Sequence, residues 1–361
     1  MLSPRPRARQ SSPSSTGGWR TLLIGCALAL AASLCAPGLA AAKRTLNAGN
    51  WDLPAQRLVV GAGLMSEAQG GGFGGAAALT PQAASTALAA LAARLEPEAE
   101  AGSAPRAAVQ AGGSITLTRF DALVVQQFGL HDVAAHVQQT AVDAGLRPPG
   151  YFGSEVVARY LGLRYDHPAG EDSLELYPWN AITRAEAAYS LAAVLQAGDW
   201  AVEGARQALD AFALPRYDAS QLAVLRIAVS KIGMPYVWGG TTDNTADGLE
   251  HGGYDCSGFA WRVYKVSGLS WGSKIRGRTA AEQAGEIEKS ARVRLGEVQP
   301  ADLLFFGSAH FSSRTTPGNI NHEGIALSSE WAIHSSGQGV YVLPLDSGWL
   351  AQRFAWARQV L

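Results

Sequence analysis

The stretch GGYDCSGFAWRVYKVSG, residues 252–268, decides how the C-terminal part of this chain folds. Apolar side chains recur in it three or four residues apart, at Phe259, Val263 and Val266. This spacing, with Gly268 as a stop, predicts a short helix with Cys256 in its first turn. Free backbone N–H groups and the helix dipole favour an anion there, and a thiolate is a nucleophile. A lone cysteine at a helix start is also common as a small core residue, so both interpretations stand.

The sequence on either side of this helix predicts an α+β fold. Ahead of it, SQLAVLRIAVSKIG (220–233) is amphipathic at helical spacing. Behind it come strand-like segments separated by polar turns, namely RVRLGEVQPADLLFFGS (292–308), NINHEGIAL (319–327), WAIHSS (331–336) and GVYVLPL (339–345). The second and third of these predict a β-hairpin. Helices followed by a meander of strands are typical of the α+β class.

Two of the seven histidines lie in the predicted hairpin, His322 in its first strand and His334 in its second. Both are even-numbered, and an odd-length turn separates the strands, so their side chains share one face as opposite or diagonal neighbours. One imidazole can then orient the other, as a base and its orienting partner do in a catalytic triad. Two alternatives stay open on spacing alone. The histidines are inert, or they share a metal ion, which would need a third ligand.

The composition indicates a globular protein. The chain has 361 residues, enough for two modest domains, with 47% apolar and 16% charged residues. The net charge is −1, so nothing indicates nucleic acid as a partner.

Residues 1–42 have the pattern of a secretory signal peptide. Four arginines precede an apolar run, which small residues follow, and we expect a cut between Ala40 and Lys43. As a membrane helix the run is interrupted at Pro37 and Gly38. The mature protein is therefore expected to be secreted, in the cell wall or periplasm, with no stable membrane insertion.

Export limits what the cysteines can do. Cutting near residue 42 removes Cys26 and Cys35 and leaves Cys256 alone. A single cysteine allows no internal disulfide and no zinc site of several cysteines. Lipid attachment at Cys26 is a minor alternative, because few apolar residues precede it.

Residues 43–213 are rich in alanine and mostly helical in pattern, with a linker-like stretch at 96–114. Three segments in this half repeat an apolar residue, a threonine and an apolar helix, and they start at Ala78, Thr116 and Ala181. The threonines expected as N-caps are Thr80, Thr118 and Thr183, and Glu186 completes a capping box in the third segment. These residues alone favour three capped helices of a bundle.

The third segment, ITRAEAAYSLAAVL (182–195), resembles the end of an S-layer homology repeat. In that family the module often holds proteins to cell-wall polymers. The resemblance implies that residues 43–213 form a helical S-layer-homology-like domain with a secondary cell-wall polymer as partner. Arg184 is the residue through which this implication is best tested.

The ordered set YVWGG, YDCSGFAW, GRTAAEQ, PADLLFF, NHEGIAL and WAIHSS resembles the NlpC-type peptidoglycan endopeptidases, which have a papain-like fold. The resemblance covers about residues 218–361, and implies a domain over 214–361. It implies that Cys256 is the nucleophile, His322 the base and His334 the residue that orients the base. It also implies that Tyr236, Asp255 and Ser257 lie against the substrate, and that no metal or cofactor is required.

The implied activity is cleavage of peptidoglycan stem peptides between γ-D-glutamate and the next residue, often a diamino acid. Three other functions remain: an N-acetylmuramoyl-L-alanine amidase, a non-catalytic wall-binding protein and an acyltransferase. The sequence departs from the family pattern at Glu323, where a small apolar residue is usual, and in two long loops, 241–253 and 308–321. Glu323 is expected to face away from the site, since neighbours alternate in a strand.

Overall fold

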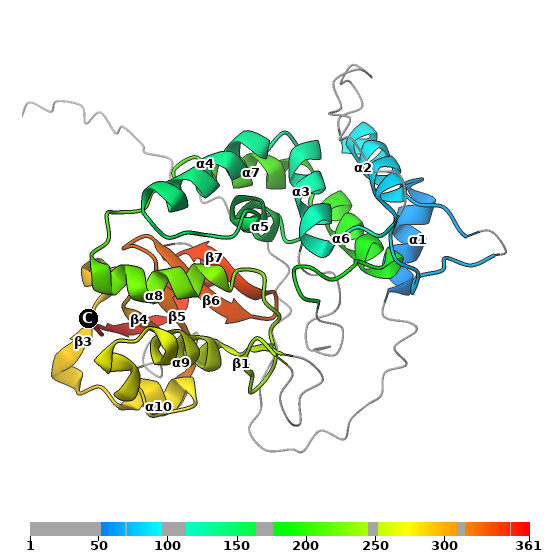
Figure 1. Cartoon of the computed structure of the whole chain (residues 1–361). Coiled ribbons are helices and arrows are strands. Elements are labelled where there is room, and N and C mark those ends of the chain that lie inside the picture. The colour runs from blue at the N-terminus through cyan, green and yellow to red at the C-terminus, as the bar shows by residue number, and fades with distance from the viewer. Residues whose placement is uncertain are drawn as a thin grey trace, which may run out of the picture. The chain divides into compact units, whose positions relative to one another are not determined.

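The computed structural model describes residues 52–68, 71–95, 113–163, 176–244, 252–308, 315–346 and 348–361 (Figure 1). They all belong to one compact unit, which spans Ala40–Leu361. The predicted signal peptide lies outside the described residues, as does most of the predicted linker. No helix in the described ranges is both long and apolar enough to cross a membrane.

The described part of the first half is helical, as its sequence predicts (Figure 1). Its helices are α1 (Leu53–Gly61), α2 (Pro81–Leu95), α3 (Leu117–Gln127), α4 (His131–Asp143), α5 (Phe152–Tyr160), α6 (Arg184–Ala197) and α7 (Asp199–Leu209). Buried alanine, valine and leucine side chains from these helices form a shared core. Small and branched apolar side chains allow close packing of this kind.

The three repeated segments meet in a closed ring of backbone hydrogen bonds. Leu79 N–H donates to the carbonyl of Ile182 at 2.8 Å, Ile182 to Ile115 at 3.0 Å, and Ile115 to Leu79 at 3.1 Å. Each of these residues lies just ahead of a helix, α2, α3 or α6. The repeats therefore form one unit, whereas their membership of the S-layer homology family stays a prediction.

The predicted N-caps are correct at Thr80 and Thr183 and wrong at Thr118. Thr80 Oγ1 accepts from Ala83 N at 3.2 Å, and Thr183 forms the full capping box with Glu186. In the second segment the N-cap is Thr116. Thr118 lies inside α3 and donates its hydroxyl to the carbonyl of Pro178 at 2.9 Å.

The second half is a mixed helix and sheet structure, which confirms the predicted α+β class. A six-stranded antiparallel sheet has the order β3-β8-β4-β5-β6-β7. Its strands are β3 (Arg292–Val293), β4 (Leu303–Gly307), β5 (Ile320–Ala326), β6 (Trp331–Ser336), β7 (Gly339–Pro344) and β8 (Phe354–Arg358). The helices are α8 (Ala219–Ser230), α9 (Cys256–Val266), α10 (Ala280–Gly285) and α11 (Gly348–Arg353), and a small ribbon pairs β1 (Thr241–Thr242) with β2 (Gly253–Tyr254).

Both faces of the sheet are buried. Phe305, Ile325 and Ile333 belong to the large core that includes Phe259 of α9. Neighbouring residues on these strands belong to a second apolar cluster with Leu350 of α11. Alternation along each strand produces these two faces, and it sends His322 and Glu323 in opposite directions.

The helical half and the sheet share one core. Helix α5 packs against β7, and the guanidinium of Arg159 lies 5.8 Å from the ring centre of Tyr341. Arg159 is paired with Glu155 at 2.8 Å, and both side chains are fully buried. The predicted boundary between residues 213 and 214 therefore does not coincide with a break in the apolar core.

Candidate active site

Cys256 is the first residue of α9, and it is half-buried. Asp255 precedes it as the N-cap, and its Oδ1 accepts the N–H of Gly258 at 2.6 Å. Gly258 is required here, because a Cβ on it would lie 1.9 Å from the carbonyl oxygen of Gly240. The helix start is thus pressed against the 239–240 turn, and this contact fixes where the thiol lies.

Arg278 holds the residues on either side of the cysteine. Its guanidinium donates from Nη1 to Asp255 Oδ1 at 3.1 Å and from Nη2 to Asp255 Oδ2 at 2.9 Å. Nη1 also donates to Ser257 Oγ at 3.0 Å. A bidentate guanidinium–carboxylate pair is strong and directional. Asp255 and Ser257 are both buried in these contacts, so their predicted contact with substrate stays a prediction.

Our sequence interpretation missed Arg278 as a functional residue. It lies 23 positions from Asp255 in the chain, in the segment GRTAAEQ, which contributed only to the family resemblance. A charged pair between residues this far apart in the chain produces no periodic pattern in the sequence. The motif itself was the only signal that could have indicated this residue.

His322 on β5 and His334 on β6 lie on one face of the sheet, and the predicted hairpin is confirmed. Gly324 is directly opposite His334, which makes His322 a diagonal neighbour. His322 Nε2 lies 2.9 Å from His334 Nδ1, and the two rings are nearly perpendicular at 88°. A Cβ on Gly324 would lie 3.0 Å from the Cβ of His334, so glycine makes room for the second ring.

Aromatic side chains pack around this histidine pair, in which His334 is fully buried and His322 is partly exposed. The ring of Trp349 from α11 lies 5.0 Å from His322 and 5.7 Å from His334, and Phe306 lies 5.8 Å from His322. Tyr341 of β7 lies 4.4 Å from His334. Burial lowers the pKa of His322 to about 3, and it lowers the pKa of His334 well below its usual value. Both imidazoles are therefore neutral near pH 7.

The thiol of Cys256 lies against β5. Burial raises its pKa to about 12, with further increases from the Glu323 and Asp255 carboxyls, while backbone hydrogen bonds from Glu323 and Ser257 oppose the rise. Glu323 follows His322 directly on β5, so the thiol lies against the strand that carries the predicted base. The sequence favoured a thiolate on the strength of the helix N-terminus, but burial outweighs that effect in the resting site.

Glu323 is fully buried, and neither of its carboxyl oxygens has a hydrogen-bond partner among the described residues. It lies opposite Phe305 in the sheet, on the face turned away from the histidines. Burial raises its pKa well above the usual value, with a further contribution from Asp255. Glu323 thus faces away from the histidines, but its carboxyl acts on the thiol of Cys256, so the expectation that it faces away from the whole site is not confirmed.

Tyr236 lies beside the strand that leads to the cysteine. It is half-buried and forms a parallel bridge with Tyr254, two residues ahead of Cys256. The next residues form the turn whose Gly239 N–H donates to Asp255 Oδ2 at 2.9 Å. This placement puts Tyr236 in the same neighbourhood as the thiol.

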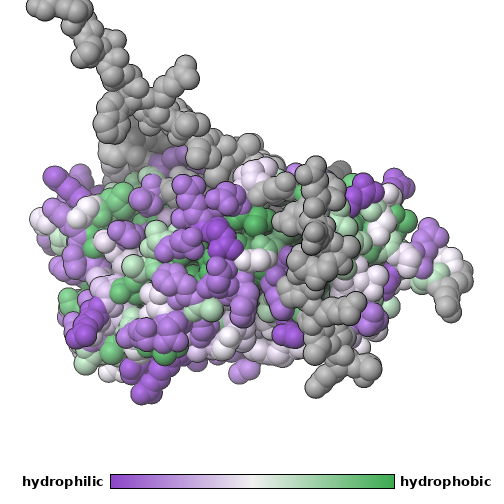
Figure 2. Space-filling model, turned by 90° about the horizontal axis from the view of Figure 1, so that it is seen from above, coloured by the Kyte–Doolittle hydropathy of each residue, from purple (hydrophilic) through white to green (hydrophobic). Residues whose placement is uncertain are grey.

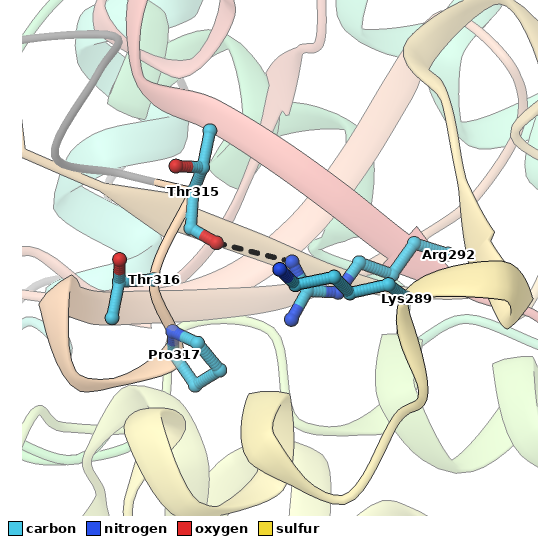
Figure 3. A pocket seen from close by; sticks show the side chains of 5 residues that line it. All are labelled: Lys289, Arg292, Thr315, Thr316 and Pro317. Atoms are coloured by element: carbon cyan, nitrogen blue, oxygen red, sulfur yellow. Dashed lines mark hydrogen bonds between the residues drawn. The ribbon is translucent and has the colours of Figure 1, made fainter.

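A cationic cavity of about 420 Å³ lies at the outer edge of the sheet (Figure 3). It is lined by Lys289, Arg292, Thr315, Thr316 and Pro317. The guanidinium of Arg292 donates to the carbonyl of Thr315 at 3.1 Å and stacks on Trp356 at 3.7 Å. The cavity belongs to the end of the long 308–321 loop, of which residues 309–314 lie outside the described residues.

Within the described ranges, no group of three or more histidine, cysteine, aspartate and glutamate side chains is arranged to hold a metal ion. The described site combines a cysteine at a helix start, against strand β5, with a hydrogen-bonded pair of neutral histidines on β5 and β6. Such a set can carry out nucleophilic acyl transfer.

Residues 233–359 match the NlpC/P60 family. The segment that matches this family contains the cysteine, both histidines, Tyr236 and Arg278. The comparison therefore supports a C-terminal NlpC/P60 domain, and it starts about one helix later than the predicted boundary at residue 214.

Curated relatives match 35–40% of the chain. A probable endopeptidase of Mycobacterium tuberculosis is 30% identical over 127 residues, covering 35% of this chain and 26% of the relative. A gamma-D-glutamyl-L-lysine dipeptidyl-peptidase of Bacillus cereus is 26% identical, covering 36% and 33%. The murein DD-endopeptidase MepH of Escherichia coli is 27% identical, covering 40% and 46%. The chain thus spans less than half the length of each of these relatives.

Proposed function

We propose that this protein is a cell-wall hydrolase, a cysteine endopeptidase that cleaves peptidoglycan stem peptides between γ-D-glutamate and the following diamino acid. The observation that carries the proposal is the 2.9 Å contact between His322 on β5 and His334 on β6, with the thiol of Cys256 lying against β5. The substrate is inferred from the relatives, one of which is named for a γ-D-glutamyl bond.

The proposed reaction begins with a neutral thiol and a neutral imidazole. Nδ1 of His322 must be unprotonated to act as base, so Nε2–H of His322 donates to Nδ1 of His334. His334 thereby keeps the ring in one tautomer and one orientation. His322 takes the proton as the sulfur attacks the carbonyl carbon, so the thiolate forms only when substrate is present.

The tetrahedral intermediate carries a negative oxygen near the helix start. The N–H of Gly258 is already taken by Asp255, whereas the N–H of Cys256 lies in the first turn, where helical backbone donors have no internal acceptor. His322 then gives its proton to the leaving amine as the C–N bond breaks. Water, deprotonated by the same imidazole, hydrolyses the thioester and restores the thiol. The proposed chemistry uses no metal or cofactor.

Asp255 and Ser257 have a positioning role in this scheme. The guanidinium of Arg278 bonds both Asp255 and Ser257. The first turn of α9 therefore cannot rotate without breaking charged hydrogen bonds. Tyr236 is proposed to contact the substrate from the neighbouring turn.

The first 42 residues are proposed to be a signal peptide, residues 43–213 a helical wall-binding region and 214–361 the peptidase domain. The proposed partner of residues 43–213 is a secondary cell-wall polymer, and the ring through Leu79, Ile115 and Ile182 supports a repeat unit there. Arg184 donates to the carbonyls of Phe73 at 3.0 Å and Ser66 at 2.6 Å. An Arg184→Ala variant should therefore be tested for thermal stability together with sedimentation on purified wall.

The first test is mass spectrometry of purified stem peptides incubated with the protein and with its Cys256→Ala variant. A cut after D-glutamate that is absent from the variant supports the proposal. Release of bare glycan would indicate an amidase, and a cut between two D-residues would match the activity for which MepH is named. An added amine in the product would indicate an acyltransferase, and full activity of Cys256→Ala would rule out the mechanism.

A further inference from the structure

A turn of the helical half contacts the chain that leads to the nucleophile. The N–H of Gly252 donates to the hydroxyl of Tyr177 at 2.7 Å. Gly252 continues directly into β2, Asp255 and Cys256. Four residues of extended chain span at most about 14 Å, so the Tyr177 hydroxyl lies within reach of a substrate held at Cys256.

The 177–180 turn is rigid. Asn180 Oδ1 accepts the N–H of Tyr177 at 2.8 Å, and Asn180 N–H donates back to the carbonyl of Tyr177 at 2.9 Å. The buried Pro178 between them accepts the hydroxyl of Thr118 through its carbonyl at 2.9 Å. A surface that is held in this way loses little conformational entropy when it binds.

This turn presents a flat aromatic surface to solvent. The rings of Tyr177 and Trp179 are stacked, with centres 5.0 Å apart and planes 6° from parallel, yet Trp179 is 59% exposed. Trp238 is 73% exposed in the turn next to Gly239, which is bonded to Asp255. On the face seen in Figure 2, hydrophobic residues form separate patches among hydrophilic ones. The exposed indole of Trp179 is small, so it suits one ring of a ligand better than a broad protein interface.

We propose that Tyr177 and Trp179 form a sugar-stacking platform, so that the substrate class is the stem peptide still attached to its glycan strand. The C–H face of a pyranose is apolar and packs on an indole ring. In the proposed substrate, alanine and D-glutamate separate the sugar from the scissile bond, and two extended residues span about 7 Å. This span is compatible with the upper limit of about 14 Å between Gly252, which is bonded to Tyr177, and Cys256. The inference rests on the proposed function and adds a binding site from the helical half.

The test compares two substrates with the same stem, one free and one linked to its muramic disaccharide. We expect kcat/KM for the linked substrate to exceed that for the free peptide by about tenfold in the unmodified protein, mainly through KM. Trp179→Ala should remove most of this ratio, and Trp179→Phe should keep part of it. Trp200→Ala is the matched control, because Trp200 is 58% exposed on α7, which packs with α4 and α5.

An unchanged ratio in Trp179→Ala, in a variant with the melting temperature of the unmodified protein, overturns the platform and leaves the peptidase intact. An equal loss in Trp200→Ala also overturns it, because the effect is then not specific to the turn. Failure of the unmodified protein to cut either substrate is a different result. It overturns the proposed function and, with it, the sugar-stacking platform that rests on that function.

Discussion

His322 and His334 are diagonal neighbours on adjacent strands, with Nε2 of the first 2.9 Å from Nδ1 of the second. Trp349, Phe306 and Tyr341 pack around the pair, in which His334 is fully buried and His322 is partly exposed. Tyr341 in turn lies under Arg159 of α5, whose positive charge contributes to the lowered pKa of His334. The helical half thus contributes to the environment of the predicted orienting residue.

Variants of His334 should show how far catalysis depends on the orientation of the His322 ring, apart from the strength of His322 as a base. We expect His334→Ala to lower kcat by roughly 100-fold, near the lower end of what a positioned general base contributes, while some activity remains. His334→Asn should recover part of it, because an amide oxygen can accept the Nε2–H of His322. Steady-state kinetics on the stem peptide measure both effects. Equal loss in the two variants would indicate that His334 only fills space.

The parts of this site that could be predicted follow from local patterns in the sequence. The helix start at Cys256 follows from apolar spacing, and the common face of the two histidines follows from strand parity. The cap of α3 shows where such reasoning ends, because Thr116 and Thr118 are equally good caps in isolation. Contact of Thr118 with Pro178, sixty positions away, decides between them.

The long-range contacts could not be predicted from one sequence. Tyr177 meets Gly252 across 75 positions, and Arg278 meets Asp255 across 23, and neither pair has a period or a spacing rule. Burial is also a property of the whole fold. This is why the thiol of Cys256 has a raised pKa, although its place at a helix start favours the anion.

Alkylation of Cys256 should report that raised pKa directly. Free cysteine is half ionised near pH 8.5, whereas the thiol here reaches that point at about 12. The rate with iodoacetamide should therefore be slow at pH 7 and rise about tenfold per pH unit up to pH 10, because only the thiolate reacts. Mass spectrometry of the labelled peptide gives the rate. Cys256→Ala corrects for any labelling at Cys26 or Cys35, and a plateau below pH 7 would instead indicate a resting thiolate–imidazolium pair.

The planar guanidinium of Arg278 should be needed for both stability and activity. Lysine keeps the charge but cannot bridge both oxygens of Asp255, which accept at 3.1 and 2.9 Å. We expect Arg278→Lys to lower the free energy of unfolding by about 1–2 kcal/mol and to lower kcat, because the first turn of α9 is released. Arg276→Lys is the control, since Arg276 is exposed two residues away. If the two variants show the same unfolding midpoint and kcat, Arg278 does not hold the site.

Glu323 should make the protein less stable as the pH rises. Its folded pKa lies well above 4.5 because burial disfavours the carboxylate, so the folded state keeps a proton that the unfolded chain has lost. Above about pH 4.5 the folded state binds more protons, and the free energy of unfolding falls by up to about 1.4 kcal/mol per pH unit until the folded carboxyl ionises. Glutamine has nearly the same shape and never ionises. Glu323→Gln should therefore melt close to the unmodified protein at pH 4 and clearly above it at pH 8.

The control for this comparison is Glu297→Gln, which removes a carboxylate from an exposed position. Its melting temperature should follow that of the unmodified protein at both pH values, because the Glu297 side chain is exposed in the folded protein. A pH-independent difference for Glu323→Gln would mean that packing, not ionisation, distinguishes the two side chains. A lower melting temperature of Glu323→Gln at pH 8 would mean that the carboxylate is ionised and paired in the folded protein.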